Sequence, residues 1–267
     1  YGRGLLLAAS DVDIPINPHA MVYVFPVIGG FVGGDTIAGM LATRIDATDG
    51  PTLMVDIGTN GEIVLAHNGR LTAASTAAGP AFEGARISCG MRGTRGAIEK
   101  VVMDDDVRLG VIGDVAPIGI CGSGLIDIAA GLLDLGLVAP LGHFVAPGEL
   151  SSDIPHAIRQ RVKVDDEGSL SFVLVDADDA AKRRPISLTQ RDIRELQLGC
   201  GAIRAGVSIL LRAAGLKPDD LATVLVAGGF GNYIRRDKAQ RLGLLPPEID
   251  HRRIHYVGNT ALAGARW

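Results

Sequence analysis

Hydrophobic and polar residues follow two different periods along the chain, and this predicts a mixed α/β fold. Short apolar or alternating runs bounded by Gly, Asn and Asp indicate strands. Apolar residues spaced by three and four positions indicate helices. Three antiparallel strands followed by strand-helix units give layers of sheet and helix. The predicted strands are residues 21–25, 52–57, 62–66, 71–76, 97–103, 107–112, 162–164, 170–175, 223–227 and 256–257.

Turn residues separate several of these runs and predict hairpins. Asn60-Gly61, between strands 52–57 and 62–66, is the strongest short hairpin signal in the chain. The acidic runs 104–106 and 165–167 also fall between paired strands, so we expect these carboxylates at turns.

Helix signals are equally local. Asp35 can cap a helix over 36–43 after the glycine-rich loop 26–34, and a helix from Leu125 follows Ser123. The longest helix opens at Thr189, with Asp192 placed for a capping box. Asn259 or Thr260 caps the last one. Within the long helix, glycines predict close packing against another helix: Gly199, Gly201 and Gly206.

Composition narrows the class of protein. Glycine accounts for 36 of 267 residues, well above the usual share of roughly 7%, so many backbone positions must turn sharply or approach something closely. A net charge of −4 with scattered Lys and Arg gives no basic stripe for nucleic acid. The sequence contains no stretch of 18 or more apolar residues, so it predicts no membrane-spanning helix. Three separated cysteines favour reduced thiols and a cytoplasmic location.

The segment 55–63, Val-Asp-Ile-Gly-Thr-Asn-Gly-Glu-Ile, carries the most chemistry. An acid at the end of a buried strand can hold hydrated Mg²⁺, while the following Gly/Thr turn offers amides and a hydroxyl to a phosphate. Asp56 is the candidate catalytic and magnesium-binding residue, through water. The phosphate ligands would be Asp56, Gly58, Thr59, Asn60 and Gly61. A plain Asn-Gly hairpin has the same pattern, and the pattern alone does not separate the two interpretations.

Two further glycine turns follow. Strand 223–227 runs into Gly228-Gly229, where bare backbone suits a nucleoside; a ligand-free strand-helix turn is the alternative. Gly122, Ser123 and Gly124 open a helix, and helix N-termini favour anions such as phosphate. The same helix start could lower the pKa of Cys121, but a small buried cysteine is the commoner case.

In this order, the three turns resemble one lobe of the superfamily of acetate and sugar kinases, Hsp70 and actin (ASKHA), an actin-like, ribonuclease H-like fold. Longer strings resemble the C-terminal domain of the reductive activators of corrinoid proteins over nearly the whole chain. These strings are Gly30–Asp35, Val55–Ile63, Ala78–Gly84, Leu188–Arg194 and Gly228–Gly231.

The resemblance implies an ATP- and Mg²⁺-dependent activase that reductively reactivates a corrinoid protein of a methyltransferase system, with electrons supplied through a [2Fe–2S] ferredoxin-like domain. It implies a nucleoside-binding turn at Gly228, Gly229, Phe230 and Asn232, and places Glu83 and Gln190 near the nucleotide cleft. The expected partners are a corrinoid protein and a second copy of the chain.

The sequence also departs from the family pattern. The Asp-x-Gly-Thr string occurs once and no four-cysteine set is present. We therefore expect residues 1–50 to be the end of a first ATPase lobe with its connection, residues 51–267 to be the second lobe, and this chain alone to be inactive. Two other functions stay open: a nucleotide-independent dimerisation or docking module, and a small-molecule kinase on the same fold.

Overall fold

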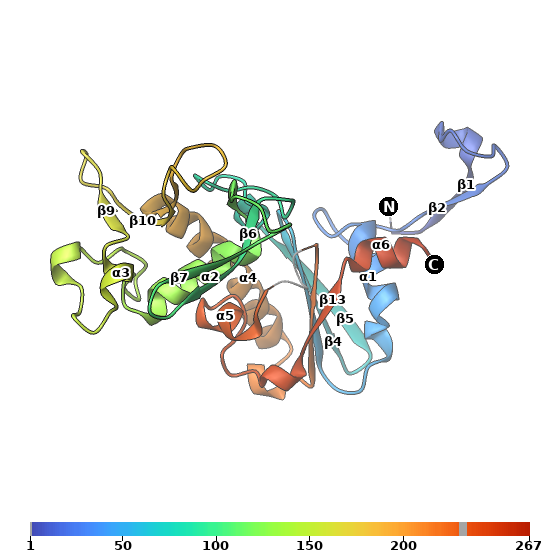
Figure 1. Ribbon diagram of the computed structural model, residues 1–267. Helices are drawn as coiled ribbons and strands as arrows, with labels where there is room; N and C mark the ends of the chain where they lie inside the picture. The colour runs from blue at the N-terminus through green and yellow to red at the C-terminus, as the bar shows by residue number, and fades with distance from the viewer. Residues whose placement is uncertain (1, 230–233) are drawn as a thin grey trace.

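The computed structural model describes residues 2–229 and 234–267 (Figure 1). Its centre is a five-stranded sheet in the order β13-β12-β3-β4-β5. An antiparallel meander forms one half, and two parallel strands extend it beside β3. These strands are β3 (Thr52–Ile57), β4 (Gly61–His67), β5 (Arg70–Thr76), β12 (Thr223–Ala227) and β13 (Ile254–Gly258). The predicted order, a meander followed by strand-helix units, is confirmed.

Helices cover both faces of this sheet. Leu53, Val55 and Ile57 of β3 pack toward α4 (Gln190–Ala213) and α5 (Arg236–Arg241) in the main hydrophobic core. Met54, on the opposite face, packs in a smaller core with α1 (Gly34–Thr43), beside which α6 (Thr260–Ala265) lies. Successive side chains of β3 therefore point alternately toward the helices on one face of the sheet and toward those on the other.

Two of the predicted helix caps are present, those of α4 and α6. Asp35 does not cap α1, which begins at Gly34 with Gly33 as its N-cap, and α2 (Gly122–Asp134) begins without a side-chain cap. The amide of Asp192 donates to Thr189 Oγ1 at 3.2 Å, and Asp192 Oδ2 accepts from the Thr189 amide at 2.8 Å, which completes the capping box of α4. Asn259 Oδ1 caps α6. By length and composition α4 could cross a membrane, but its buried stripe packs on the sheet through Ile203 and Val207, as a core helix does.

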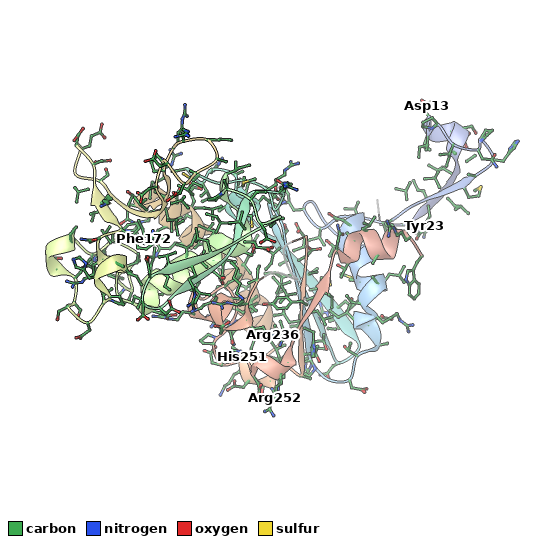
Figure 2. All side chains as sticks on the ribbon, in the orientation of Figure 1. Asp13, Tyr23, Phe172, Arg236, His251 and Arg252 are labelled. Atoms are coloured by element: carbon green, nitrogen blue, oxygen red, sulfur yellow. The ribbon has the colours of Figure 1, made fainter. Side chains whose placement is uncertain are left out.

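An insertion, residues 77–189, separates β5 from α4. It carries two further three-stranded sheets, β7-β6-β8 and β11-β10-β9, and Phe172 lies inside it (Figure 2). Its elements are β6 (Ala97–Met103), β7 (Val107–Val111), β8 (Gly119–Ile120), α2 (Gly122–Asp134), α3 (His156–Arg159), β9 (Val162–Val164), β10 (Leu170–Val175) and β11 (Ile186–Thr189). Acidic turns join β6 to β7 and β9 to β10, as predicted.

A two-stranded ribbon, β1 (Leu5–Ala8) with β2 (Met21–Val24), projects away from the rest of the molecule. Figure 2 shows Asp13 and Tyr23 on this projection. The structure confirms the predicted strand at 21–25, with its end one residue earlier; its partner β1 was not predicted. Leu6 and Met21 are 62% and 58% exposed, so much of the apolar surface of the ribbon faces solvent.

Two further local predictions are wrong. Neither Asn60 nor Gly61 has a positive φ, so the hairpin turn is Gly58–Asn60 rather than an Asn-Gly turn. Gly61 lies in β4, where a Cβ would stand 2.7 Å from Ile203 of α4. The glycines of α4 do not pack on another α-helix. Gly199 meets Phe82 of the 3-10 helix Pro80–Glu83 and the backbone at Ala78, Gly206 meets β4 and β5, and Gly201 meets nothing within 4 Å in the described part of the chain.

Candidate functional site

Three carboxylates converge where β3 ends. Asp56 is paired in register with Glu62 of β4, and both residues have the same parity as the side chains that face α1. Asp35 lies in the first turn of α1, which covers this face. The three therefore form an acidic cluster at the carboxyl edge of the sheet, and Ser75 Oγ donates to Glu62 Oε1 at 3.1 Å.

The surroundings of the cluster disfavour its negative charge. Burial, followed by repulsion from Glu62 and Asp35, raises the pKa of Asp56 to about 6. Burial also raises the pKa of Glu62, against the hydrogen bond from Ser75. A divalent cation would relieve this repulsion, and carboxylate oxygens are ligands that Mg²⁺ accepts. Among the described residues no three His, Cys, Asp or Glu side chains are arranged to hold a metal ion directly, so Mg²⁺ would be held here through its water shell.

The turn after Asp56 brings two predicted residues together. Thr59 Oγ1 donates to Glu83 Oε1 at 2.6 Å, which places Glu83 beside the candidate phosphate loop. The Gly58 amide donates to the Asn60 carbonyl at 3.0 Å and closes the turn. Thr59 and Asn60 are exposed at its tip, where a ligand can reach them.

Gly228 joins the second glycine turn to the first. Its amide donates to the Gly258 carbonyl at 3.0 Å, and its φ is +105°. A Cβ on Gly228 would lie 3.0 Å from Asp56 Oδ1 and closer still to the Ile57 carbonyl oxygen. Only glycine fits between the two strands here. Gly229 is exposed, whereas Phe230 and Asn232 lie outside the described residues.

The other predicted residues have different surroundings. Gly122, Ser123 and Gly124 are buried at the start of α2, where Gly124 packs on the Ile98 backbone; their role as phosphate ligands stays a prediction. Cys121 is buried too, with Sγ 3.3 Å from the Ile98 carbonyl. Gln190 binds the loop after α2 through both ends of its side-chain amide, accepting from the Phe144 amide at 2.9 Å and donating to the Gly142 carbonyl at 2.7 Å.

Sequence reasoning missed Asp35 and Glu62 as members of the site. Glu62 could have been found, since it stands opposite Asp56 across a three-residue turn and must share its face of the sheet. Asp35 gave only the signal of a helix cap. Its approach to Asp56 depends on how α1 packs on the sheet.

A salt bridge between Arg235 and Asp127 joins the segment before α5 to α2. Arg235, the residue before α5, donates from Nε to Asp127 Oδ1 at 3.1 Å. Asp127 is 5% exposed and also accepts from the Val101 amide. Burial raises the pKa of Asp127, against the hydrogen bond from Val101 and the charge of Arg235. The pair joins the insertion to the core beside a small cavity of about 150 Å³ between α2 and α5.

Replacing Asp127 by Ala should lower the free energy of unfolding by about 2–3 kcal/mol, because the Val101 amide loses its partner and Arg235 its counter-ion. Urea denaturation measures the change. The matched control is Asp104→Ala, which breaks the exposed pair with Arg108 and should cost less than about 1 kcal/mol. Equal losses in the two variants would contradict a structural role for Asp127.

Comparisons with known proteins show the family of this chain. Residues 50–267 match the family described as the C-terminal domain of RACo, the ASKHA domain, and residues 3–48 match the RACo middle region. The corrinoid activation enzyme RamQ of Eubacterium limosum is 41% identical over 97% of this chain and 43% of its own length. The Methanosarcina barkeri [Co(II) methylated amine-specific corrinoid protein] reductase is 30% identical over 92% of this chain and 44% of its own.

A solved structure, that of a reductive activator for a corrinoid, iron-sulfur protein, superposes with a TM-score of 0.85 at 38% identity, covering 98% of this chain and 40% of that one. The chain thus spans about two-fifths of the length of these relatives. It belongs to the family of reductive activators of corrinoid proteins, and residues 50–267 are its ASKHA domain.

Proposed function

We propose that this chain supplies the Mg²⁺-ATP-binding lobe of an activase that reductively reactivates the corrinoid protein of a methyltransferase system. The observation that carries the nucleotide part is the convergence of Asp35, Asp56 and Glu62 beside the Gly58–Asn60 turn and Gly228. The corrinoid partner is proposed from the relatives, whose names describe activation or reduction of corrinoid proteins.

Each residue would contact a different part of Mg²⁺-ATP, according to its position in the site. Asp56 and Glu62 would hold Mg²⁺ through its water shell, with Asp35 completing the acidic wall. Mg²⁺, when bound, neutralises charge on the phosphates. The tip of the turn at Thr59 and Asn60 would bind phosphate oxygens, and Glu83 would fix the Thr59 hydroxyl. The nucleoside would lie along Gly228 and Gly229.

The exposed apolar ribbon supports the presence of a first lobe beside this one. An isolated two-stranded ribbon is marginal in water, and its exposed Leu6, Met21 and Tyr23 would be buried by further polypeptide. We propose that residues 1–50 end a first lobe and that ATP binds between the two lobes. Lobe closure would change the face that grips the corrinoid protein, so binding would couple to partner conformation.

The [2Fe–2S] cluster has no site among the residues of this chain. Such clusters take four cysteine ligands, whereas the chain has three cysteines, of which Cys121 and Cys200 are buried apart in α2 and α4 packing. We propose that electrons reach the corrinoid through a separate ferredoxin-like part of the protein.

The test is a calorimetric titration of the full-length polypeptide that contains this chain with ATP and Mg²⁺, together with reactivation of an oxidised corrinoid protein. We expect saturable binding and ATP-dependent reactivation, both lost in Asp56→Ala and kept in Asp166→Asn, which alters an exposed turn. Partner binding without any nucleotide requirement would favour the docking-module alternative, and metabolite-dependent ATP turnover the kinase.

Binding of Mg²⁺ and nucleotide should weaken as the pH falls from 7 to 5. With a pKa of about 6, Asp56 is largely protonated at pH 5, and its proton must leave before Mg²⁺ binds. Each pH unit below 6 should cost up to about tenfold in affinity. Calorimetry in buffers of different ionisation enthalpy should detect proton release near pH 5.5, after correction for the nucleotide's own protonation. An affinity for Mg²⁺ and nucleotide that stays the same from pH 5 to pH 8 would contradict the assignment.

A further inference from the structure

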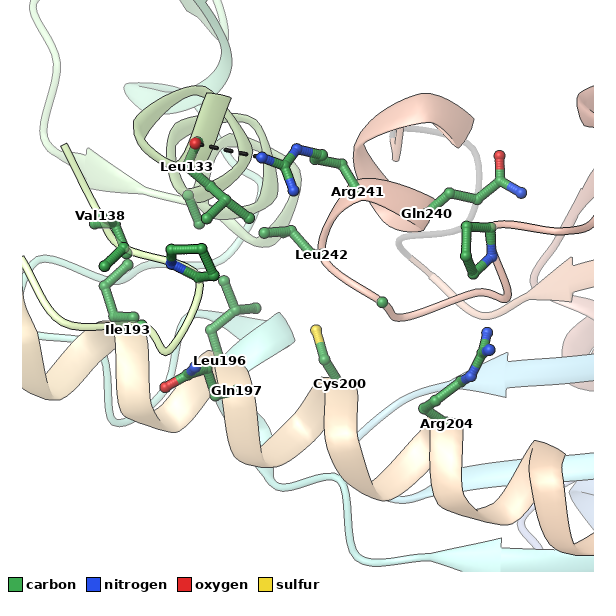
Figure 3. Close-up of a pocket in the computed structure, with 16 residues that line it drawn as sticks. Leu133, Val138, Ile193, Leu196, Gln197, Cys200, Arg204, Gln240, Arg241 and Leu242 are labelled. Atoms are coloured by element: carbon green, nitrogen blue, oxygen red, sulfur yellow. Dashed lines mark hydrogen bonds between the residues drawn. The ribbon is translucent and has the colours of Figure 1, made fainter. Parts of the chain in front are cut away.

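A cavity formed by described residues lies apart from the acidic cluster. It has a volume of about 440 Å³ and is lined by α2, the loop after α2, α4, and the end of α5 with the segment that follows it. Figure 3 shows Cys200 and Arg204 on α4 pointing toward α5 and that segment. A volume of this size suits a small ligand.

Most of its wall is apolar. Leu133, Val138, Ile193, Leu196 and Leu242 contribute side chains from four segments of the chain. Burial raises the pKa of the Cys200 thiol to about 12, so this side chain stays neutral and adds to the apolar surface. The body of a matching ligand is therefore aliphatic or aromatic.

The charged groups of the wall have one sign. Arg204 and Arg241 line the cavity, and none of its described lining residues is Asp or Glu. Arg241 already has partners, since it pairs with Asp134 and donates to the Leu133 carbonyl. Arg204 forms a longer ion pair, at 3.4 Å, with the half-exposed Glu248. Its Nη1 is buried without a hydrogen-bond partner in the described part of the chain.

An unpaired buried donor carries a cost that a ligand oxygen would remove. We propose that this cavity binds a small organic carboxylate with an aliphatic body, whose carboxylate pairs with Arg204 after the guanidinium turns from Glu248. The apolar part would lie against Leu196 and Leu242. The proposal does not rest on the nucleotide function, because none of its residues belongs to the acidic cluster or the glycine turns.

Calorimetry with octanoate on the full-length polypeptide tests it, with 1-octanol as a probe that lacks the charge. We expect saturable octanoate binding that weakens at least tenfold in Arg204→Gln and recovers in Arg204→Lys. Octanol binding should change less than twofold between them. Arg212→Gln, on the exposed end of the same helix, should bind octanoate as the unaltered protein does.

A second variant locates the ligand. Cys200→Leu adds bulk to the cavity without changing charge and should weaken octanoate and octanol together, while a single cooperative thermal unfolding transition shows that the protein remains folded. Absence of saturable octanoate binding to the unaltered protein would overturn the proposal. So would octanoate binding that is equal in Arg204→Gln, or unaffected by Cys200→Leu.

Discussion

Asp56→Asn should abolish Mg²⁺-dependent nucleotide binding and at the same time stabilise the fold. The variant keeps the size of the side chain but removes the charge that faces the cation, so we expect affinity to fall about 100-fold or more, close to 2.7 kcal/mol. Isothermal titration measures this loss. An unchanged affinity in Asp56→Asn would show that the Asp56 carboxylate takes no part in binding Mg²⁺ and nucleotide.

The gain in stability follows from the sign of the pKa shift. The folded state holds the Asp56 proton up to about pH 6, whereas the unfolded chain releases it near the ordinary aspartate pKa of 3.8. Ionisation therefore favours the unfolded state, fully above pH 6 and not at all below pH 4. Asp56→Asn should raise the free energy of unfolding by about 1–3 kcal/mol at pH 7, and this gain should vanish at pH 4.

Such a variant, more stable and less active, is expected where like charges are held together for a ligand. Urea denaturation at the two pH values provides the measurement, with Asp166→Asn as the matched control. A loss of stability at pH 7 would show that Asp56 is held by favourable contacts instead of opposing its neighbours.

Gly228→Ala should destabilise the protein and disrupt the same site. The methyl group would meet the Ile57 carbonyl and the Asp56 carboxylate, and the backbone at φ +105° is strained for any residue with a Cβ. We expect a loss of about 2–3 kcal/mol in the free energy of unfolding, with weaker Mg²⁺-ATP binding because Asp56 must move.

The neighbouring glycine provides the control. A Cβ on Gly229 would meet no atom of the described residues within 4 Å, so Gly229→Ala should change stability by less than about 0.5 kcal/mol. Thermal denaturation of both variants would separate them clearly. Equal effects would mean that the exchange of glycine itself matters, and not the contact between Gly228 and β3.

Features that depend on local sequence could be predicted. The capping box of α4 rests on Thr189 and Asp192, three residues apart, and the β3–β4 hairpin rests on alternation around a short turn. Details that depend on packing could not. The Gly58–Asn60 turn replaces an Asn-Gly turn because Gly61 must pass close under Ile203, which lies far along the chain.

The same distinction applies to the candidate site. Asp56 was found from its strand and the glycines that follow it, since both signals are local. Asp35 became a member only when α1 packed on the sheet, and Gly201 of α4 proved to face open space, which its helical position alone does not reveal. Contacts between distant segments decide such cases.

The parallel pairing of β3 with β12 has a consequence for folding. The meander of β3, β4 and β5 can form early, because its contacts are local, but β12 reaches β3 only after residues 77–222 have been placed. Long-range pairing of this kind is slow to form. Asp56 lies at the end of β3, and Gly228 directly follows β12. The candidate nucleotide site should therefore be among the last parts of the domain to assemble, after the insertion has folded.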